Sequence, residues 1–234
     1  GYAIPGRYPD PNLKPQNQSA FEIGADLRLF NGRITIDATY YRNMTTNNIA
    51  DIDAPNSTGY FYFKKNAGKI LNKGVELMVG LTPVHNQVKW DINLNFAANR
   101  QTVKELDPSV DMLNLTSGWS GLQVKAAVGE PFSLYGVGWE RDPDGNILIN
   151  ASNGSRLTSS TAVNLGKIAP DWTLGIGNTL SFKGLSLGFL IDIRQGGVMY
   201  SGTVSSLRTS GQAKETLLND RMPIIDQGVV QQAD

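Results

Sequence analysis

The chain has 234 residues, with 21 Lys plus Arg balanced by 21 Asp plus Glu, and it contains no cysteine. The balanced charge leaves no excess that would draw the chain to nucleic acid or to an acidic lipid surface. Without cysteine, disulfides and thiol chemistry are excluded. Charged residues make up 18% of the sequence, below the roughly 25% usual for soluble domains. No apolar run approaches the roughly 18 residues of a spanning helix, but a membrane β-barrel needs none.

Alternating apolar and polar residues predict six β-strands, which come in three pairs. The first pair, 20–30 and 33–42, is joined by Asn31-Gly32, a strong hairpin signal because both residues tolerate positive φ. The second pair, 74–81 and 88–100, is joined by residues 82–87. The third pair, 172–182 and 185–194, is joined by a tight turn at Lys183-Gly184.

The strand at 88–100 shows the alternation most clearly. Its apolar residues are Trp90, Ile92, Leu94 and Phe96, and its polar residues include Asp91, Asn93 and Asn95. In a soluble sandwich the apolar face would point to a core. In a membrane barrel the apolar face points to lipid and the polar face to the lumen.

The connections between the pairs favour the barrel. Residues 47–70, 100–171 and 195–234 are long, irregular and polar or glycine-rich, which is uncommon inside a compact soluble domain. Short turns alternating with long loops are the layout of an outer-membrane barrel, with the long loops extracellular. Aromatic residues near the short turns (Phe30, Trp90, Phe182) and at the opposite strand ends (Tyr40, Trp172) are typical of two interfacial girdles.

Several segments resemble the SusC/RagA-type TonB-linked outer-membrane transporters, in the family's order. They include "NLKPQNQSAFEIGADLRLFNGRITIDATYYRNMTTNNI", "NAGKILNKGVEL", "WDINLNFAANRQTV", "VGEPFSLYGVGWERDPDGNILI", "KIAPDWTLGIGNTLSFKGLSLGFLIDIRQGG" and "TSGQAKETLLNDR". The resemblance covers essentially the whole chain. It implies an all-β fold: an antiparallel segment of a 22-stranded transmembrane β-barrel in the bacterial outer membrane. Since the sequence shows neither a plug-like region nor a TonB box, we expect residues 1–234 to be part of the barrel domain of a longer chain.

The resemblance also implies a function and partners. Members of this family import oligosaccharides or peptides, capture them with a SusD-like surface lipoprotein, and are energised by TonB acting on the plug. The segment itself would supply wall, lumen lining and extracellular loops, in contact with outer-membrane lipid, with no catalytic role, cofactor or bound metal. The alternatives are a soluble glycan-binding β-sandwich and a surface hydrolase. For the hydrolase, the sequence offers no nucleophile–histidine pair that we can place.

Two sets of candidate site residues follow. Aromatic residues in the long connections could contact substrate or the lid lipoprotein, although packing at strand ends or within loops also explains them. These are Tyr60, Tyr62, Trp119 and Trp139. Polar residues of the strands are expected to face the lumen, where they could set selectivity, wet the lumen or pair with the plug. These are Glu22, Asp26, Arg28, Asp37, Asp91, Asn93, Asn95, Asp192 and Arg194.

The stretch "DPDGN" at 142–146 invites comparison with a calcium loop. Its glycine comes at the fourth position instead of the sixth, and the twelfth position is Asn153 instead of glutamate. We therefore predict a proline-containing β-turn here.

Overall fold

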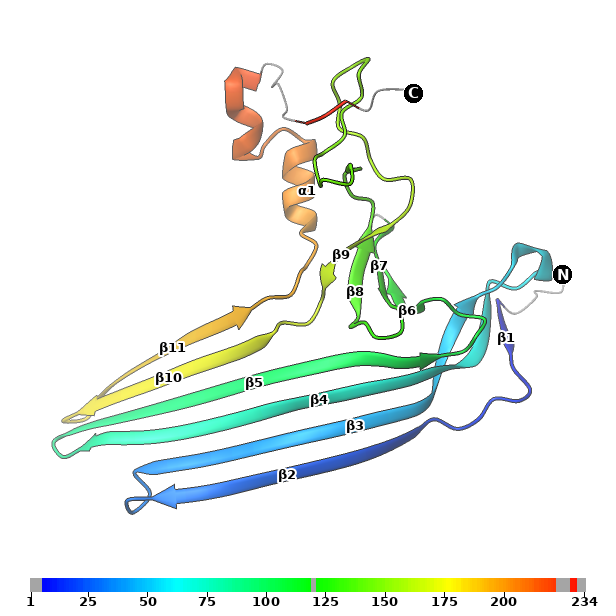
Figure 1. Cartoon of the computed structure of the whole chain (residues 1–234). Helices are drawn as coiled ribbons and strands as arrows, with labels where there is room; N and C mark the ends of the chain where they lie inside the picture. The colour runs from blue at the N-terminus through cyan, green and yellow to red at the C-terminus, as the bar shows by residue number, and fades with distance from the viewer. Residues whose placement is uncertain (1–5, 119–120, 222–227, 231–234) are drawn as a thin grey trace.

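The chain folds mainly into antiparallel strands in a computed structural model, which describes residues 6–118, 121–221 and 228–230 (Figure 1). No helix in these ranges is long and apolar enough to cross a membrane. The elements, in chain order, are β1 (Arg7–Pro9), β2 (Asn17–Leu29), β3 (Ile34–Asp53), η1 (Asn56–Thr58), β4 (Tyr62–His85), β5 (Val88–Leu106), β6 (Leu113–Ser117), β7 (Gln123–Ala126), β8 (Ser133–Gly136), β9 (Val163–Lys167), β10 (Trp172–Phe182), β11 (Leu185–Gln195), α1 (Gly202–Thr209) and η3 (Lys214–Arg221).

The six predicted strands form one sheet, in the order β11-β10-β5-β4-β3-β2. All neighbours in this path are antiparallel, and the sheet is open, with β2 and β11 at its edges. The three short turns lie together at one end of the sheet, and the long connections lie at the other (Figure 1). Asn31, Gly32, Lys183 and Gly184 all have positive φ, so the two predicted tight turns are confirmed.

The turn of the second hairpin is shorter than predicted. β4 continues to His85 and β5 begins at Val88, so the turn holds two residues where we expected six, from 82 to 87. One extra residue of β4 is accommodated between the pairs Leu81–Ile92 and Val84–Trp90 as a β-bulge. Pro83, which has no N–H to donate to the ladder, lies in this bulge. Because the bulge shifts the period of two, the sequence pattern does not show that β4 continues beyond it.

The predicted irregular connection at 47–70 is mostly strand, which corrects our expectation. β3 runs to Asp53 and β4 begins at Tyr62, so the hairpin extends well beyond the six-strand sheet. Bulges mark the transition: Asn47 has φ of 54° and Gly68 has φ of 148°. A side chain at Gly68 would meet the Glu105 carbonyl oxygen at 1.9 Å, so only glycine fits there. Beyond the bulges apolar and polar residues are mixed on both faces, so no alternation reveals the strand.

The other two long connections are also more regular than predicted. β5 extends to Leu106, and the residues after it form a second, four-stranded sheet in the order β6-β7-β8-β9. After β11 the chain forms the helix α1 and the 3-10 helix η3. The strands of the second sheet have only four or five residues each, which is too short for a period of two to be recognised.

One face of the six-strand sheet, which we call the apolar face, is apolar across every strand. Cross-strand pairing aligns one residue of each strand into a continuous row perpendicular to the strands. The row consists of Leu27, Ile36, Val79, Leu94, Ile176 and Ile191. Leu27 and Ile191 are about half exposed, and Leu187, four residues before Ile191 in β11, is 62% exposed. An exposed apolar surface of this extent is uncommon on a soluble monomer and is the outer face of a membrane barrel.

Between the short turns and the row of Tyr40, Val75 and Ala98, one polar side chain interrupts the apolar face. Asn178 of β10 pairs with Ile92 and Phe189, in line with apolar neighbours. Its Oδ1 accepts a hydrogen bond from Nε1 of Trp90 at 3.3 Å, and its side chain is buried. The tryptophan covers the amide and satisfies it, so this polar group is shielded.

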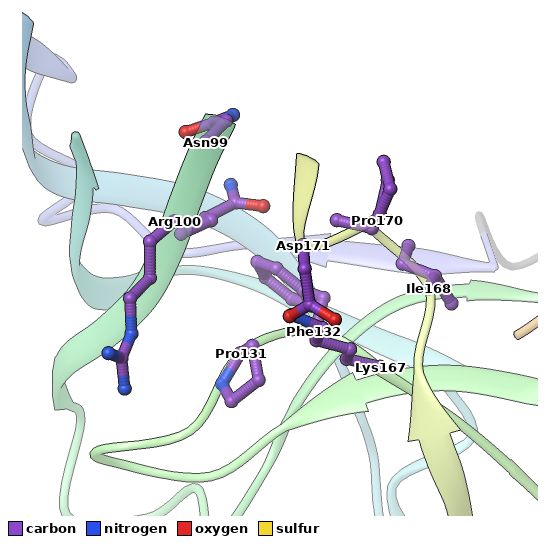
Figure 2. Close-up of a pocket in the computed structure, with 10 residues that line it drawn as sticks. Asn99, Arg100, Pro131, Phe132, Lys167, Ile168, Pro170 and Asp171 are labelled. Carbon is purple, nitrogen blue, oxygen red and sulfur yellow. The ribbon is translucent and has the colours of Figure 1, made fainter. Parts of the chain in front are cut away.

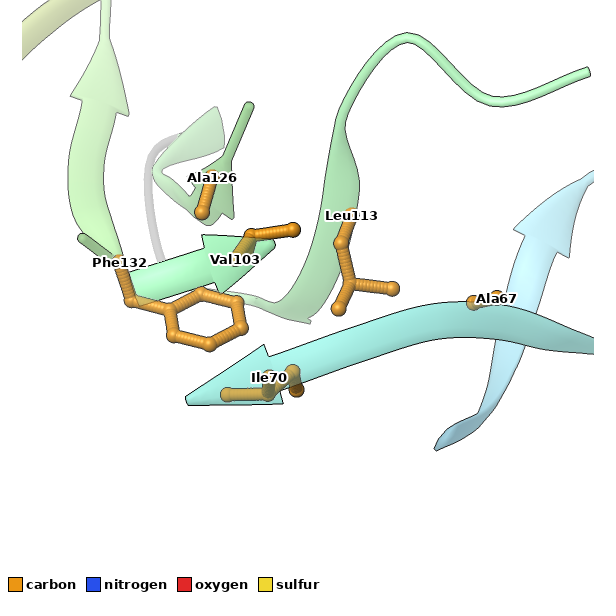
Figure 3. Close-up of a cluster of buried hydrophobic side chains, with 6 residues drawn as sticks. All are labelled: Ala67, Ile70, Val103, Leu113, Ala126 and Phe132. Atoms are coloured by element: carbon orange, nitrogen blue, oxygen red, sulfur yellow. The ribbon is translucent and has the colours of Figure 1, made fainter. Parts of the chain in front are cut away.

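The buried hydrophobic core lies where the wall meets the second sheet (Figure 3). Its members come from β4, β5, β6, β7 and the segment before β8, and they are Ala67, Ile70, Val103, Leu113, Ala126 and Phe132. Ile70 and Val103 are paired across the strands, and unbroken alternation places them on the same face as Met78 and Asn95. The second sheet is therefore anchored over the polar face of the wall.

The two faces predict opposite tolerance to charge at adjacent positions. In the full-length protein folded into lipid vesicles, Leu94→Arg should lower the free energy of unfolding by about 2–4 kcal/mol, as expected for arginine in lipid near the midplane. Asn93→Arg, its matched control on the polar face, should have little effect. Equal losses in a denaturant titration of the two variants would contradict the assignment of the faces.

The core predicts how the second sheet is held. Phe132 is 3% exposed, and Phe132→Ala should cost about 3–5 kcal/mol of local stability because it leaves a cavity. Limited proteolysis of the folded full-length protein should then cleave within residues 107–171 faster than in the wild type. The control Val128→Ala, at a 56% exposed position in the same connection, should not change the cleavage rate. Unchanged proteolysis in Phe132→Ala would show that the cluster does not anchor the sheet.

Candidate functional site

The nine polar residues predicted to face the lumen all lie on the polar face of the sheet. Five of them line a shallow hollow of about 310 Å³ on strands β2, β3, β4 and β5. These five are Asp26, Arg28, Asp37, Asn93 and Asn95. The structure therefore brings together residues that are up to 69 positions apart in the sequence, the separation of 26 and 95.

Charge in this hollow is unbalanced. Asp26 and Asp37 are direct cross-strand partners, an arrangement that is unfavourable for two like charges. Arg28 lies 3.6 Å from Asp26 and offsets part of the repulsion. With the two amides of Asn93 and Asn95, the hollow offers carboxylate and amide groups to a polar or cationic ligand, or to a neighbouring protein segment.

The other four predicted residues lie outside the hollow. Asp91 is bound by Lys89 at 2.7 Å and accepts a hydrogen bond from Thr82 at 2.8 Å. Arg194 donates to the Ile168 carbonyl oxygen at 3.2 Å, so it holds the chain segment that precedes β10. Glu22 is paired across strands with Tyr41, and Asp192 with Gly175.

Two apolar residues on the polar face were missed by the sequence analysis. Met78 is 54% exposed and Leu190 is 68% exposed, and both lie in register rows with polar residues. Each lies between two residues of the apolar face, so the period of two is the signal that could have placed it on the polar face.

The predicted contact residues Tyr60 and Tyr62 lie at the tip of the extended β3–β4 hairpin, where β1 pairs with β4 in parallel. Tyr60 packs edge-on against Tyr8, with ring centroids 5.2 Å apart. The guanidinium of Arg7 lies 5.9 Å from the Tyr62 ring and is also bound to Asp51 at 2.7 Å. Both tyrosines thus take part in packing at the hairpin tip, although Tyr62 remains 40% exposed.

Trp139 lies on a different projection, after β8, and is 46% exposed beneath the guanidinium of Arg156 at 5.2 Å. No contact in the described residues connects Trp139 with Tyr60 or Tyr62. Trp119 falls outside the described residues. In residues 142–145 the Gly145 N–H donates to the Asp142 carbonyl oxygen at 3.0 Å, which confirms the predicted β-turn. The amide N–H and the side chain of Asn146 also donate to the Asp142 carboxylate, at 2.8 and 2.9 Å. These hydrogen bonds lower the pKa of Asp142.

A further cavity, of about 360 Å³, lies where β5 and β10 diverge (Figure 2). It is lined by residues 99–101, 131–132 and 167–171. Lys167 and Asp171 form an ion pair at its edge. Gly196 and Gly197 pass close by with positive φ, and a side chain at Gly196 would collide with the Asp171 carboxylate. The sequence analysis missed this cavity because its three segments meet only in the fold.

Burial and local hydrogen bonds shift the pKa values of two groups in the segments that follow β5. The pKa of Tyr135 in β8 is raised by burial and by the neighbouring Glu130, to whose carboxylate its hydroxyl donates at 3.4 Å. The pKa of Asp107 is lowered by hydrogen bonds from Ser109. Among the described residues, no group of three or more His, Asp or Glu side chains is arranged to hold a metal ion.

An open antiparallel sheet with one continuous apolar face, one polar face, short turns at one end and large connections at the other defines a segment of a transmembrane β-barrel wall. The family described as TonB dependent receptor-like, beta-barrel matches residues 1–211. The chain belongs to this family, whose members are bacterial outer-membrane proteins, and the predicted fold class is confirmed.

Curated relatives agree with this assignment. The chain is 29% identical over 217 residues to TonB-dependent receptor P26 of Formosa agariphila, a match that covers 84% of this chain and 22% of the relative. It is 23% identical over 232 residues to TonB-dependent receptor P3 of the same organism, covering 89% of this chain and 23% of the relative. The chain thus spans less than a quarter of the length of these relatives.

Solved structures show the same fold. The RagAB peptide importer in its closed-closed state superposes with a TM-score of 0.62 at 24% identity, covering 80% of this chain and 22% of that chain. The RagAB peptide transporter gives a TM-score of 0.58 at 24% identity, covering 76% and 21%. The predicted resemblance to SusC/RagA-type transporters is confirmed by these neighbours and by the family match.

Proposed function

We propose that this chain forms part of the wall, the lumen lining and the extracellular rim of a TonB-dependent importer of oligosaccharide or peptide nutrients. The observation that carries the proposal is the row of six apolar residues across six strands, backed by a polar hollow on the opposite face. An outward apolar face needs lipid, and an inward polar face needs water or a plug. The nine polar-face residues then line the lumen.

The rim is proposed to consist of the connections at about 47–70, 100–171 and 195–234. The second sheet β6–β9 and the hairpin tip project from the end of the wall that is opposite to the short turns (Figure 1). This is the end at which a SusD-like surface lipoprotein would sit, with Tyr60, Tyr62 and Trp139 as candidate contacts for it or for the substrate. TonB would act through the plug of the whole protein.

The class of cargo is proposed from the solved neighbours and from the exposed aromatic rings. The RagAB neighbours are described as a peptide importer, which favours peptide, and the exposed rings of Trp139 and Tyr62 would suit either a peptide or a sugar. A soluble glycan-binding sandwich is not favoured, because no second sheet covers the apolar face within the described residues. We propose no catalytic role for any residue.

The experiment is a pull-down of the full-length parent from detergent-extracted outer membranes, with partners identified by mass. We expect a stoichiometric surface lipoprotein, and Trp139→Ala should weaken its retention or substrate uptake about tenfold, the effect of losing one aromatic anchor. Val137→Ala, at a 65% exposed position in the same segment after β8, is the matched control. Recovery of the parent in the soluble fraction without a partner would contradict the importer. An unaffected Trp139→Ala variant would remove that residue from the contact surface.

A further inference from the structure

A row of three cations crosses the apolar face at its extracellular edge. Arg42 of β3 is paired with Lys73 of β4, and Lys73 is paired with Arg100 of β5. Alternation places all three on the same side as the apolar rows, two residues beyond the row of Tyr40, Val75 and Ala98. All three side chains are exposed. Like charges placed directly opposite one another across strands destabilise a sheet unless a counter-charge is present.

No ion pair with the described part of the chain neutralises these cations. None of the three cations has an ion pair or a side-chain hydrogen bond there. All carboxylates of the six strands between the short turns and this row lie on the polar face, and they are Glu22, Asp26, Asp37, Glu76, Asp91 and Asp192. By contrast, Lys69, two rows further out, is paired with Glu105. The three cations are therefore the only charges on the apolar face up to this level.

Their height matches the outer boundary of the hydrocarbon layer. Trp90 lies near the short turns on the same face of β5, and ten residues separate it from Arg100. Ten residues span about 33 Å along a strand, and a strand tilt of about 40° reduces this to about 25 Å across the membrane, the height of the apolar band of such barrels. The cations thus lie at the level of lipid headgroups in the outer leaflet.

A hollow of about 240 Å³ adjoins the row on the side of the membrane. Tyr40, Val75 and Ala98 contribute apolar walls, and Lys73 and Arg100 border it. Asp171 also borders it, but its carboxylate is bound to Lys167. A molecule with an anionic head and an apolar body would place its head on the cations and its body in this hollow and on the apolar rows below.

We infer that Arg42, Lys73 and Arg100 form a binding site for the phosphate groups of a phosphorylated lipid of the outer leaflet. Arginine binds phosphate oxygens in a bidentate manner, and lysine adds a point charge between the two guanidinium groups. The inference rests on the outward orientation of the apolar face in the proposed importer. It does not depend on which nutrient is imported.

The test uses the full-length parent in detergent and native mass spectrometry with two probes, diphosphorylated lipid A and the same glycolipid with both phosphates removed. The wild type should bind the phosphorylated form at least about tenfold more tightly, as expected for charge-assisted contacts. Arg42→Gln, Lys73→Gln and Arg100→Gln combined should abolish this preference while binding of the dephosphorylated form stays unchanged. The absence of a preference in the wild type would overturn the inference, as would its persistence in the triple variant.

A control variant changes the same number of charges elsewhere. Lys14→Gln, Lys125→Gln and Lys214→Gln combined lie outside the six-strand wall and should leave the preference intact. An equal loss in this control would reduce the effect to net charge and overturn the site. Displacement of the lipid from the wild type by millimolar inorganic phosphate would show a site for free anions. Loss of the surface lipoprotein from the triple variant, with unchanged lipid binding, would show a protein contact. Either result overturns the lipid assignment.

Folding of the variants is checked by heat-modifiable migration in gel electrophoresis. If the triple variant does not fold, Lys73→Gln alone should reduce the preference, and Arg42→Lys with Arg100→Lys should retain most of it because the charges remain. Nutrient uptake is measured separately. Absence of uptake by the wild type with an intact lipid preference would contradict the importer and leave this site standing, and uptake without a lipid preference would contradict the site alone.

Discussion

The hydrocarbon interior of a bilayer offers no hydrogen-bond partner to a polar group, and this constraint organises the wall. Every backbone group at membrane depth has to be paired between strands. Six long antiparallel strands meet this demand with unbroken ladders over the apolar rows, and the bulges lie near the strand ends. The open edges at β2 and β11 would need further strands in lipid, in keeping with relatives of which this chain covers less than a quarter.

The same constraint explains where stability resides. The wall has almost no buried hydrophobic side chains of its own, because its apolar groups face outward. The buried cluster around Val103 and Phe132 forms instead where the second sheet folds over the polar face, in the aqueous region above the membrane. Two solvents thus govern one chain: lipid stabilises the wall from outside, and water drives the packing of the rim. The unpaired cations of the apolar face lie at the boundary between them.

The sequence predicted the wall well because its pattern is strictly local. A period of two reveals each strand and each face, and Asn31-Gly32 and Lys183-Gly184 reveal two of the turns. The period of two does not reveal a strand where the two faces have similar composition, as beyond Asn47, or where a bulge shifts the period, as at Pro83. The rim was missed because its strands are short and its core joins residues from 67 to 132.

Predictions about the site divide in the same way. Which residues share the polar face follows from alternation, but the hollow around Asp26 and Asp37 depends on register between strands. The alignment of Arg42, Lys73 and Arg100 is equally a product of register, since nothing within each strand marks it. The packing of Tyr60 against Tyr8 depends on the parallel pairing of β1 with β4, which no local sequence pattern predicts.

The central claim is that the apolar face contacts lipid and the polar face lines the lumen. Single cysteines at positions 92 to 96 of β5, introduced into the full-length protein after any cysteine outside this cysteine-free chain has been replaced, can carry a fluorophore that is read against quenchers attached to lipid chains. The account predicts strong quenching at Ile92, Leu94 and Phe96 and weak quenching at Asn93 and Asn95, with a period of two. Uniform quenching along the strand, or the opposite alternation, would contradict it.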